Sequence, residues 1–247
     1  MKARIVLSMV LVALMIGGCV PLPDMGEILS QVSVTGSGNV ITKEFDLSGF
    51  DQVEVSGAFV ADITRGDSFS VVVRVDEKLE EHLRVQAAGR TLEVGLAPSL
   101  SILGTATRVV EITMPELARL ELSEATQGTI SGFESTADLS VEVSGASKLG
   151  GDIQSGDARF EVSGASTVDL SGSRGALVLD VSGASTADLS DFAVNDANVE
   201  ASGASSATVN ATGRLDAEAS GASRIQYLGT PTLGRVESSG ASTIGPG

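Results

Sequence analysis

The phrase Ser-Gly-Ala-Ser recurs six times in the second half of this 247-residue chain at a nearly constant spacing. The copies begin at Ser144, Ser163, Ser182, Ser202, Ser220 and Ser239, which are 19, 19, 20, 18 and 19 residues apart. Degenerate copies begin at Ser123 and at the outlying Ser56. A fixed period near 20 residues is typical of a solenoid, in which each unit buries its apolar face against its neighbours. A Gly/Ser linker has no such register, so the repeat predicts a stacked fold.

Apolar residues alternate on both sides of each phrase. Val141 and Val143 lie three positions and one position before Ser144, and Val168 and Leu170 follow the next copy. A period of two indicates strands with one buried face, and the Gly of the phrase tolerates the backbone angles of a corner. We therefore expect an all-β parallel β-helix with coils of ~19 residues, each with two or three short strands. The small Ser and Ala residues suit a crowded corner, and the hydroxyls can bind its backbone groups.

The helix should be right-handed, because parallel crossover connections are almost always right-handed. A left-handed hexapeptide helix would place an apolar residue at every sixth position, which this chain does not do. A calcium-binding nonapeptide roll requires Gly-Gly-x-Gly-x-Asp, and the nearest stretch, "GGDIQSGDA" from Gly150, does not match. The chain has no Trp and 3% aromatic residues, so we expect Val, Leu, Ile and Ala to fill a narrow interior.

The half that precedes residue 123 is less regular but still rich in predicted strands. Its alternation is broken by a turn at Arg65-Gly66-Asp67 and by a corner at Pro115. The stretch from Asp76 to Leu83 predicts one short helix with Asp76 as its cap. We expect residues 32–247 to form a single β-helix domain, with regular repeats from about residue 123.

The N-terminus resembles the lipobox of bacterial lipoproteins. Lys2 and Arg4 precede an apolar stretch that is too short for a comfortable transmembrane helix, and "IGGC" ends at Cys19. The resemblance implies a signal peptide over residues 1–18, acyl chains such as palmitate on Cys19, and a tether over residues 19–31. An ordinary signal peptide with an incidental Cys is the alternative. Val20 rather than Asp after the Cys resembles the sorting pattern of outer-membrane lipoproteins, so we expect an extracytoplasmic, lipid-anchored protein at the outer membrane.

The charge of the chain excludes some partners. The net charge is −16, and −18 once residues 1–18 are removed, which argues against nucleic acid and anionic lipid surfaces as ligands. Cys19 is the only cysteine, so no intrachain disulfide is expected.

A row of acidic residues lies two positions before each phrase. Its members are Glu142, Glu161, Asp180, Glu200, Glu218 and Glu237, preceded by Glu121 at the degenerate copy. Since inward apolar residues flank them, these side chains should point outward from one sheet and stack at ~4.8 Å, where their repulsion should raise their pKa values. The row is either a solvated face that discourages sideways sheet association or a linear surface that binds Ca²⁺. No other cofactor is expected.

Enzymatic motifs are scarce in this sequence. His82 is the lone histidine and Gly-x-Ser-x-Gly does not occur, which argues against a His/Cys metal centre and a serine hydrolase. The alternative function is a carbohydrate-active enzyme of the polysaccharide lyase or hydrolase type, which would need a pocket with two close carboxylates or an Asp–Arg–Lys group. Because the carboxylates form a row and few aromatic residues could stack on sugars, we expect no enzyme.

Several stretches of the first half, together with the repeats, resemble the head GIN domain family of bacterial putative auto-transporter adhesins. They are "GSGNVITKEFDLSGFDQVEVSGAF", "ITRGD", "DEKLEEHL", "RTLEVGL" and "EITMPELARLELSEA", and the resemblance covers residues 34–240. It implies a right-handed parallel β-helix on an envelope protein with a non-catalytic, adhesin-like role. Nothing before the final "STIGPG" resembles a translocator barrel, so we expect the lipid on Cys19 to attach the chain to the membrane. The other expected partner is an unidentified envelope protein or polysaccharide, and a stiff spacer without a ligand is a further alternative.

Overall fold

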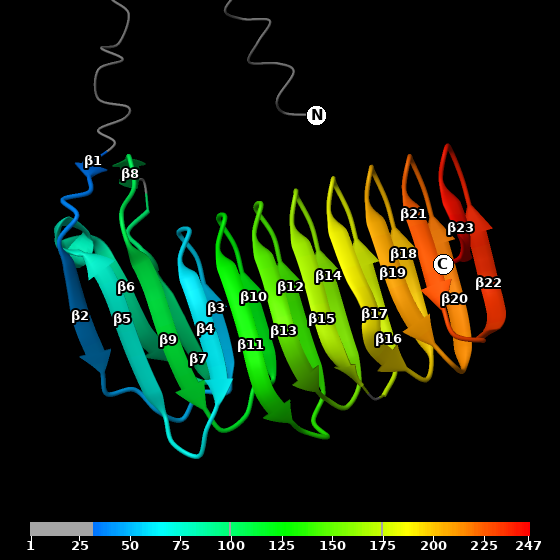
Figure 1. The fold of residues 1–247 in the computed structure, drawn as a ribbon, viewed down its shortest axis with the longest axis horizontal. Coiled ribbons are helices and arrows are strands. Elements are labelled where there is room, and N and C mark those ends of the chain that lie inside the picture. The colour runs from blue at the N-terminus through cyan, green and yellow to red at the C-terminus, as the bar shows by residue number, and fades with distance from the viewer. Residues whose placement is uncertain (1–31, 99, 174) are drawn as a thin grey trace, which may run out of the picture. The chain divides into compact units, whose positions relative to one another are not determined.

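Two sheets of short, mostly parallel strands form the body of the protein in a computed structural model (Figure 1). The structure describes residues 32–98, 100–173 and 175–247, and residues 33–247 form one compact unit. The predictions for the signal peptide, Cys19 and the tether therefore lie outside the described residues.

Both sheets extend along the solenoid, with strands of neighbouring coils side by side. In spatial order, sheet 1 contains β6 (Leu83–Ala88), β7 (Thr91–Leu96), β3 (Gln52–Val55), β10 (Arg119–Leu122), β12 (Leu139–Val143), β14 (Ala158–Val162), β16 (Leu177–Val181), β18 (Ala197–Ala201), β20 (Arg214–Ala219) and β22 (Thr232–Ser238). Sheet 2 contains, likewise in spatial order, β2 (Val40–Phe45), β5 (Ser70–Asp76), β9 (Arg108–Met114), β4 (Val60–Arg65), β11 (Gln127–Glu134), β13 (Lys148–Gln154), β15 (Thr167–Ser173), β17 (Thr186–Val194), β19 (Ser206–Ala211), β21 (Arg224–Leu228) and β23 (Thr243–Pro246). A separate pair joins β1 (Val32–Thr35) to β8 (Leu100–Leu103).

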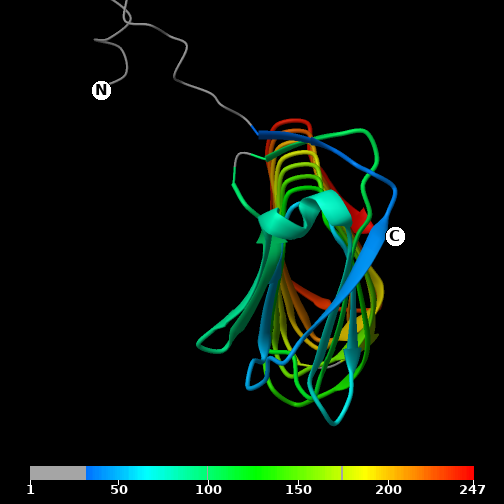
Figure 2. The same ribbon diagram turned by 90° about the vertical axis from the view of Figure 1, so that its left-hand side faces the viewer.

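Each regular coil takes one strand from each sheet and has two corners. In one coil, for example, β12 leads through the phrase at Ser144 into β13, and β12 pairs in parallel with β14 of the next coil. The phrase forms the narrow corner, and these corners stack behind one another at the top of Figure 2. The predicted parallel β-helix is thereby confirmed, with two strands per coil.

The direction of the backbone hydrogen bonds fixes the hand of the coil. Ser144 and Ser163 directly follow β12 and β14, and by the alternation of those strands their side chains face outward. Their N–H groups donate to Leu122 O and Val143 O of the preceding coil, each at 2.9 Å. In a strand of L-residues, the side to which a side chain points determines the side to which its N–H points. An outward residue that donates to the preceding coil requires right-handed winding, as expected.

The phrase residues hold successive corners together. Gly183 has a φ of +75°, and a Cβ there would lie 2.5 Å from Gly164 O of the coil below, so both the conformation and the close approach require glycine. The last Ser of the phrase is buried at Ser147, Ser166, Ser185, Ser205 and Ser223. The Oγ of Ser166, for example, accepts a hydrogen bond from Ser147 N at 3.2 Å. The expectation that the hydroxyls bind corner backbone groups is confirmed.

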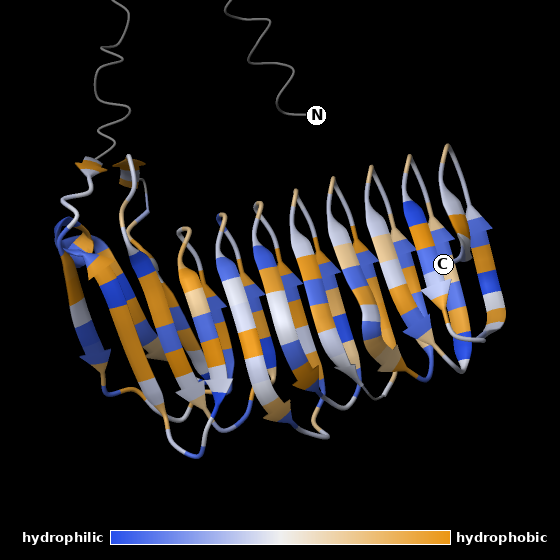
Figure 3. Cartoon of the chain, viewed as in Figure 1, coloured by the Kyte–Doolittle hydropathy of each residue, from blue (hydrophilic) through white to orange (hydrophobic). Residues whose placement is uncertain are grey.

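The interior is a narrow stack of aliphatic side chains. Along β14 and β16, buried and exposed residues alternate strictly, and many strands of the solenoid carry both orange and blue bands in Figure 3. Val143, Val162 and Val181 occupy one column of buried residues in register. Each fully buried Val contributes roughly 1.5–3 kcal/mol of burial free energy. Phe160 and Phe192 pack edge to face, with ring centroids 5.6 Å apart.

The first coil is stacked out of chain order. Strands β3 and β4 form a coil that contains the outlying phrase at Ser56, and β3 pairs on one side with β7 and on the other with β10. Likewise β4 pairs with β9 and with β11. The chain therefore builds this coil, leaves it, adds a coil on one side with β7 and β9, and returns to the other side with β10. The repeat period gives no sign of this order.

Antiparallel strands and a short helix cover the end of the solenoid, beyond the coil that contains β7 and β9. Strand β5 pairs antiparallel with β2 and β9, and β6 pairs antiparallel with β7. The predicted helix is a 3-10 helix, η3 (Glu77–His82), which faces the viewer in Figure 2. The Asp76 side chain accepts hydrogen bonds from Lys78 N at 3.1 Å and Ser37 N at 2.8 Å, as expected of a cap. Within the described ranges, no helix is long and apolar enough to cross a membrane.

Candidate functional site

The acidic row is in register along sheet 1. Each predicted carboxylate lies opposite its counterpart in the next coil, from Glu142 and Glu161 through Asp180, Glu200 and Glu218 to Glu237. Glu142 also pairs with Glu121, as expected, and the row extends beyond the prediction because Glu121 pairs with Glu54 and Glu54 with Glu93. Glu54 lies two positions before Ser56, which is the spacing of the row at all the other phrases. Because Ser56 is far from the regular repeats in sequence, this spacing was not enough to place Glu54 in the row.

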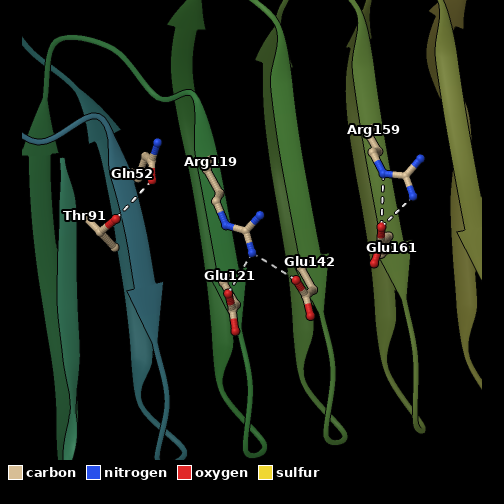
Figure 4. A network of polar contacts seen from close by, with 7 residues as sticks. All are labelled: Gln52, Thr91, Arg119, Glu121, Glu142, Arg159 and Glu161. Carbon is tan, nitrogen blue, oxygen red and sulfur yellow. Dashed lines mark hydrogen bonds and ion pairs between the residues drawn. The ribbon is translucent and has the colours of Figure 1, made fainter. Parts of the chain in front are cut away.

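Arginines on the same outer face of sheet 1 form ion pairs with several carboxylates of the row. Figure 4 shows Arg119 between two strands, with its Nη2 at 3.0 Å from Glu121 Oε2 and 3.1 Å from Glu142 Oε2. Arg159 Nη2 lies 2.6 Å from Glu161 Oε1. These side chains are substantially exposed, so each pair contributes about 0–1 kcal/mol. Their main effect is to interrupt the run of negative charge.

The pKa values of two members of the row move in opposite directions. Burial, aided by the charges of Glu121 and Glu93, raises the pKa of Glu54 above its ordinary value. On the last strand of sheet 1, the hydrogen bond and charge of Arg235 hold the pKa of Glu237 below its ordinary value. The expectation of raised pKa values along the whole row is therefore wrong at Glu237, because sequence spacing alone did not show how closely Arg235 approaches that carboxylate.

The row does not form a compact metal centre. Among the residues that the structure describes, no group of three or more His, Cys, Asp or Glu side chains is arranged to hold a metal ion. Ca²⁺ usually takes six to eight oxygen ligands, which a single-file row of carboxylates does not gather around one point. Calcium binding by the row stays an untested alternative to a solvated face.

A shallow hollow over the wide corners contains the side chains that the carbohydrate-enzyme alternative would need. It has a volume of about 330 Å³, and Asp138, Asp157 and Arg159 are among its lining residues. The two carboxylates already have structural partners: Asp138 Oδ1 accepts from Asp157 N at 3.1 Å, and Asp157 Oδ1 accepts from Ala176 N at 2.8 Å. Each Asp thus joins its coil to the next, which accounts for its position without catalysis.

A larger hollow of about 530 Å³ lies beside the first narrow corner, where Gly57 and Arg108 are among its lining residues. The repeat pattern did not predict it. The only signal was the stretch from residue 97 to 107, which interrupts the alternating pattern.

Comparison with protein families identifies the chain. The family model "Putative auto-transporter adhesin, head GIN domain" matches residues 49–231. The chain belongs to this family. The resemblance inferred from the sequence is thereby confirmed, and none of the curated proteins compared matches this GIN-domain chain.

Solved structures share the fold of this GIN-domain protein. A putative adhesin from Bacteroides fragilis has a TM-score of 0.78 at 19% identity, over 86% of this chain and 99% of that one. A putative adhesin from Parabacteroides merdae has a TM-score of 0.67 at 17% identity, over 87% and 99%. A putative lipid binding protein from Parabacteroides distasonis has a TM-score of 0.66 at 19% identity, over 87% and 99%. At these identities the likeness concerns the fold.

Proposed function

We propose that this GIN-domain protein is a non-catalytic, adhesin-like binding protein of the bacterial envelope, held at the outer membrane by a lipid on Cys19. Family membership supports a surface role, and two of the similar structures are named as putative adhesins. The "IGGC" sequence that ends at Cys19 supports the lipid anchor.

The observation that carries the proposal is the register of the outer face of sheet 1. Successive coils present equivalent side chains at one level, as the pairs Glu161–Asp180 and Asp180–Glu200 illustrate. A repetitive ligand, such as an envelope polysaccharide or a repetitive protein, would meet the same contact once per coil. Weak contacts repeated along one rigid surface add up through high effective concentration.

The lipid anchor is tested by the substitution Cys19→Ser. The variant should lose metabolic palmitate labelling and should no longer partition into detergent, whereas Ser30→Ala, outside the lipobox, should behave as wild type. A Cys19→Ser protein that still labels and still partitions into detergent would refute the anchor.

The binding role is tested by displaying the full chain on a bacterial host and measuring retention on immobilised envelope polysaccharides and proteins. Wild type should be retained. Changing Glu161, Asp180 and Glu200 together to Gln should reduce retention, whereas changing Asp169 and Asp188, exposed on sheet 2, to Asn should not. Retention no better than that of the empty host would favour the spacer, and release of reducing or unsaturated sugars would favour the enzyme.

A further inference from the structure

The stack of narrow corners ends at the first coil. At the first narrow corners each corner donates a backbone hydrogen bond to the next one, as when Ala58 N donates to Glu124 O and Ala125 N to Gly145 O. The coil that contains β7 and β9 has no such corner, because the chain leaves β7 and passes through β8, which pairs with β1, before it enters β9. No corner therefore stacks on the capped side of Gly57, and the 530 Å³ hollow lies beside it.

The wall of the hollow opposite this corner is apolar. Leu96 at the end of β7 and Leu100 and Ile102 of β8 line it, and all three side chains are half-buried. These three apolar side chains are therefore partly exposed to solvent, and no described residue covers them completely. A volume of about 530 Å³ is within the range of small-molecule sites, roughly 300–1,000 Å³.

The guanidinium of Arg108 lines the same hollow and has no carboxylate partner among the described residues. Its Nη1 donates to Gly57 O at 3.2 Å, in the place where a stacked corner would have supplied a backbone N–H. Its Nε is enclosed and has no hydrogen-bond partner in the described part of the chain. Burial lowers the pKa of Arg108, in contrast to Arg119, whose pKa is raised by its pairing with Glu121.

A half-buried cation without a counter-ion is costly, and an anion that reached it would remove part of that cost. A carboxylate suits a guanidinium because its two oxygens match the N–H fork. Glu124 is the one acidic side chain that lines the hollow, and its charge disfavours a dianion such as a phosphate monoester. A singly charged ligand with an apolar portion fits both the Arg108 end and the apolar wall.

We propose that the hollow between the first narrow corner and β8 binds a small organic monocarboxylate, with the carboxylate on Arg108 and a short apolar chain against Leu96, Leu100 and Ile102. This site lies at the capped end of sheet 1 and sheet 2, so it is separate from the surface along the coils on which the proposed adhesin role depends.

The test is a titration of the full chain in lipid nanodiscs with hexanoate, followed by ligand-observed NMR and corrected with empty nanodiscs. A ligand of this size should bind with a Kd on the order of 1 mM. Arg108→Gln should weaken binding at least 10-fold, whereas Arg84→Gln, an exposed arginine on β6, should not. Hexanol and hexylamine should bind at least 10-fold more weakly than hexanoate to wild type.

A second variant guards against a folding defect in Arg108→Gln. Ile102→Glu keeps Arg108 and places a negative charge on the apolar wall, so it should also abolish hexanoate binding while circular dichroism stays that of wild type. Equal hexanoate binding by wild type and Arg108→Gln would overturn the proposal, as would equal binding of hexyl phosphate. Binding seen only after Glu124→Gln would also overturn it, because Glu124 would then be the partner of Arg108.

Discussion

Identical phrases adopt two different corner conformations in this protein. At the corners of residues 56–59, 123–126 and 144–147, the Ala of the phrase has a positive φ, with values of 57° at Ala58, 64° at Ala125 and 71° at Ala146. In the later corners the Gly of the phrase, such as Gly164 and Gly183, has a positive φ but the Ala does not. The hydrogen bonds change with it: Ala125 N donates forward to Gly145 O, whereas Ala184 N donates back to Gly164 O. The phrases at Ser144 and Ser163 are the same four letters, so no local pattern could have predicted this change.

The first prediction uses this difference. Ala146→Gly should raise the free energy of unfolding by up to about 1 kcal/mol, because Ala is strained at positive φ and Gly is not. Ala184→Gly is the matched control, since Ala184 is equally exposed and has no such strain. It should lower stability by about 0.5–1 kcal/mol through the greater freedom of the unfolded chain. Urea unfolding measures the free energy of unfolding of both variants, and changes of the same sign in the two would contradict the prediction.

The second prediction concerns one buried position in the middle of the array. Val181 is fully buried between two neighbouring coils. Val181→Asp should therefore destabilise the protein by several kcal/mol, because it buries an unpaired carboxylate. Ser238 is exposed on the last strand of sheet 1, so Ser238→Asp should change stability by no more than about 0.5 kcal/mol. Equal shifts of the urea midpoint would argue against nearest-neighbour stacking.

At the scale of one element, the acidic row is a series of different local environments. Arg119 contacts two of its members, whereas Glu54 is crowded by Glu121 and Glu93 and partly buried. The alternation and spacing of the repeats predicted that the carboxylates would stack, and the register of sheet 1 confirms it. The pKa of Glu54 is raised mainly by burial and that of Glu237 is lowered by Arg235, and the spacing of the repeats shows neither of these surroundings.

The third prediction follows from the opposite pKa shifts of Glu54 and Glu237. The pKa of Glu54 is raised on folding, so its contribution to stability is present below 4.5 and is lost as the pH rises through the folded value. The pKa of Glu237 is lowered, so its contribution is present above 4.5 and is lost as the pH falls. At pH 7, Glu54→Gln should raise the melting temperature and Glu237→Gln should lower it. Both differences should shrink at pH 3, and effects of the same sign at pH 7 would be inconsistent with this account.

The fourth prediction separates the two interpretations of the row. If the row binds calcium, millimolar Ca²⁺ raises the melting temperature more than NaCl of equal ionic strength, and changing Glu161, Asp180 and Glu200 together to Gln removes most of that increment. Because arginine ion pairs interrupt the row and its carboxylates are in single file, we expect the two salts to have equal effects, as for a solvated face. A calcium increment that the triple variant loses would show a cation-binding surface.

At the scale of the whole solenoid, amide exchange should follow the position of each coil in the stack. Strands β3 and β4 each have a strand paired on both sides, so their amides should be among the slowest to exchange. Strand β22 pairs only with β20, and Val236 on it is 42% exposed, so its amides should exchange much faster. Hydrogen–deuterium exchange with mass spectrometry measures both segments, and equal protection would contradict the stacking order.

The repeat in the sequence predicted the regular coils, whereas the parts of the fold that depart from the repeat were not predicted. A period near 19 residues determines strands, corners and the column of Val143, Val162 and Val181, because each coil copies the previous one. The pairing of β3 with both β7 and β10 joins segments far apart in sequence, and no period encodes it. The hollow at Arg108 was missed for the same reason, since it exists only because the chain departs from the coil between β7 and β9.

The stacking order of the first coil has a consequence for how the protein is made. A chain that crosses a membrane from its N-terminus delivers β3 and β4 before either of the strand pairs that flank them. Those two strands stay unpaired until their partners are available, which are β7 and β9 on one side and β10 and β11 on the other. The regular coils, in contrast, can add one at a time to a finished neighbour. Until those partners arrive, the edges of β3 and β4 are exposed, and unpaired strand edges of this kind favour aggregation.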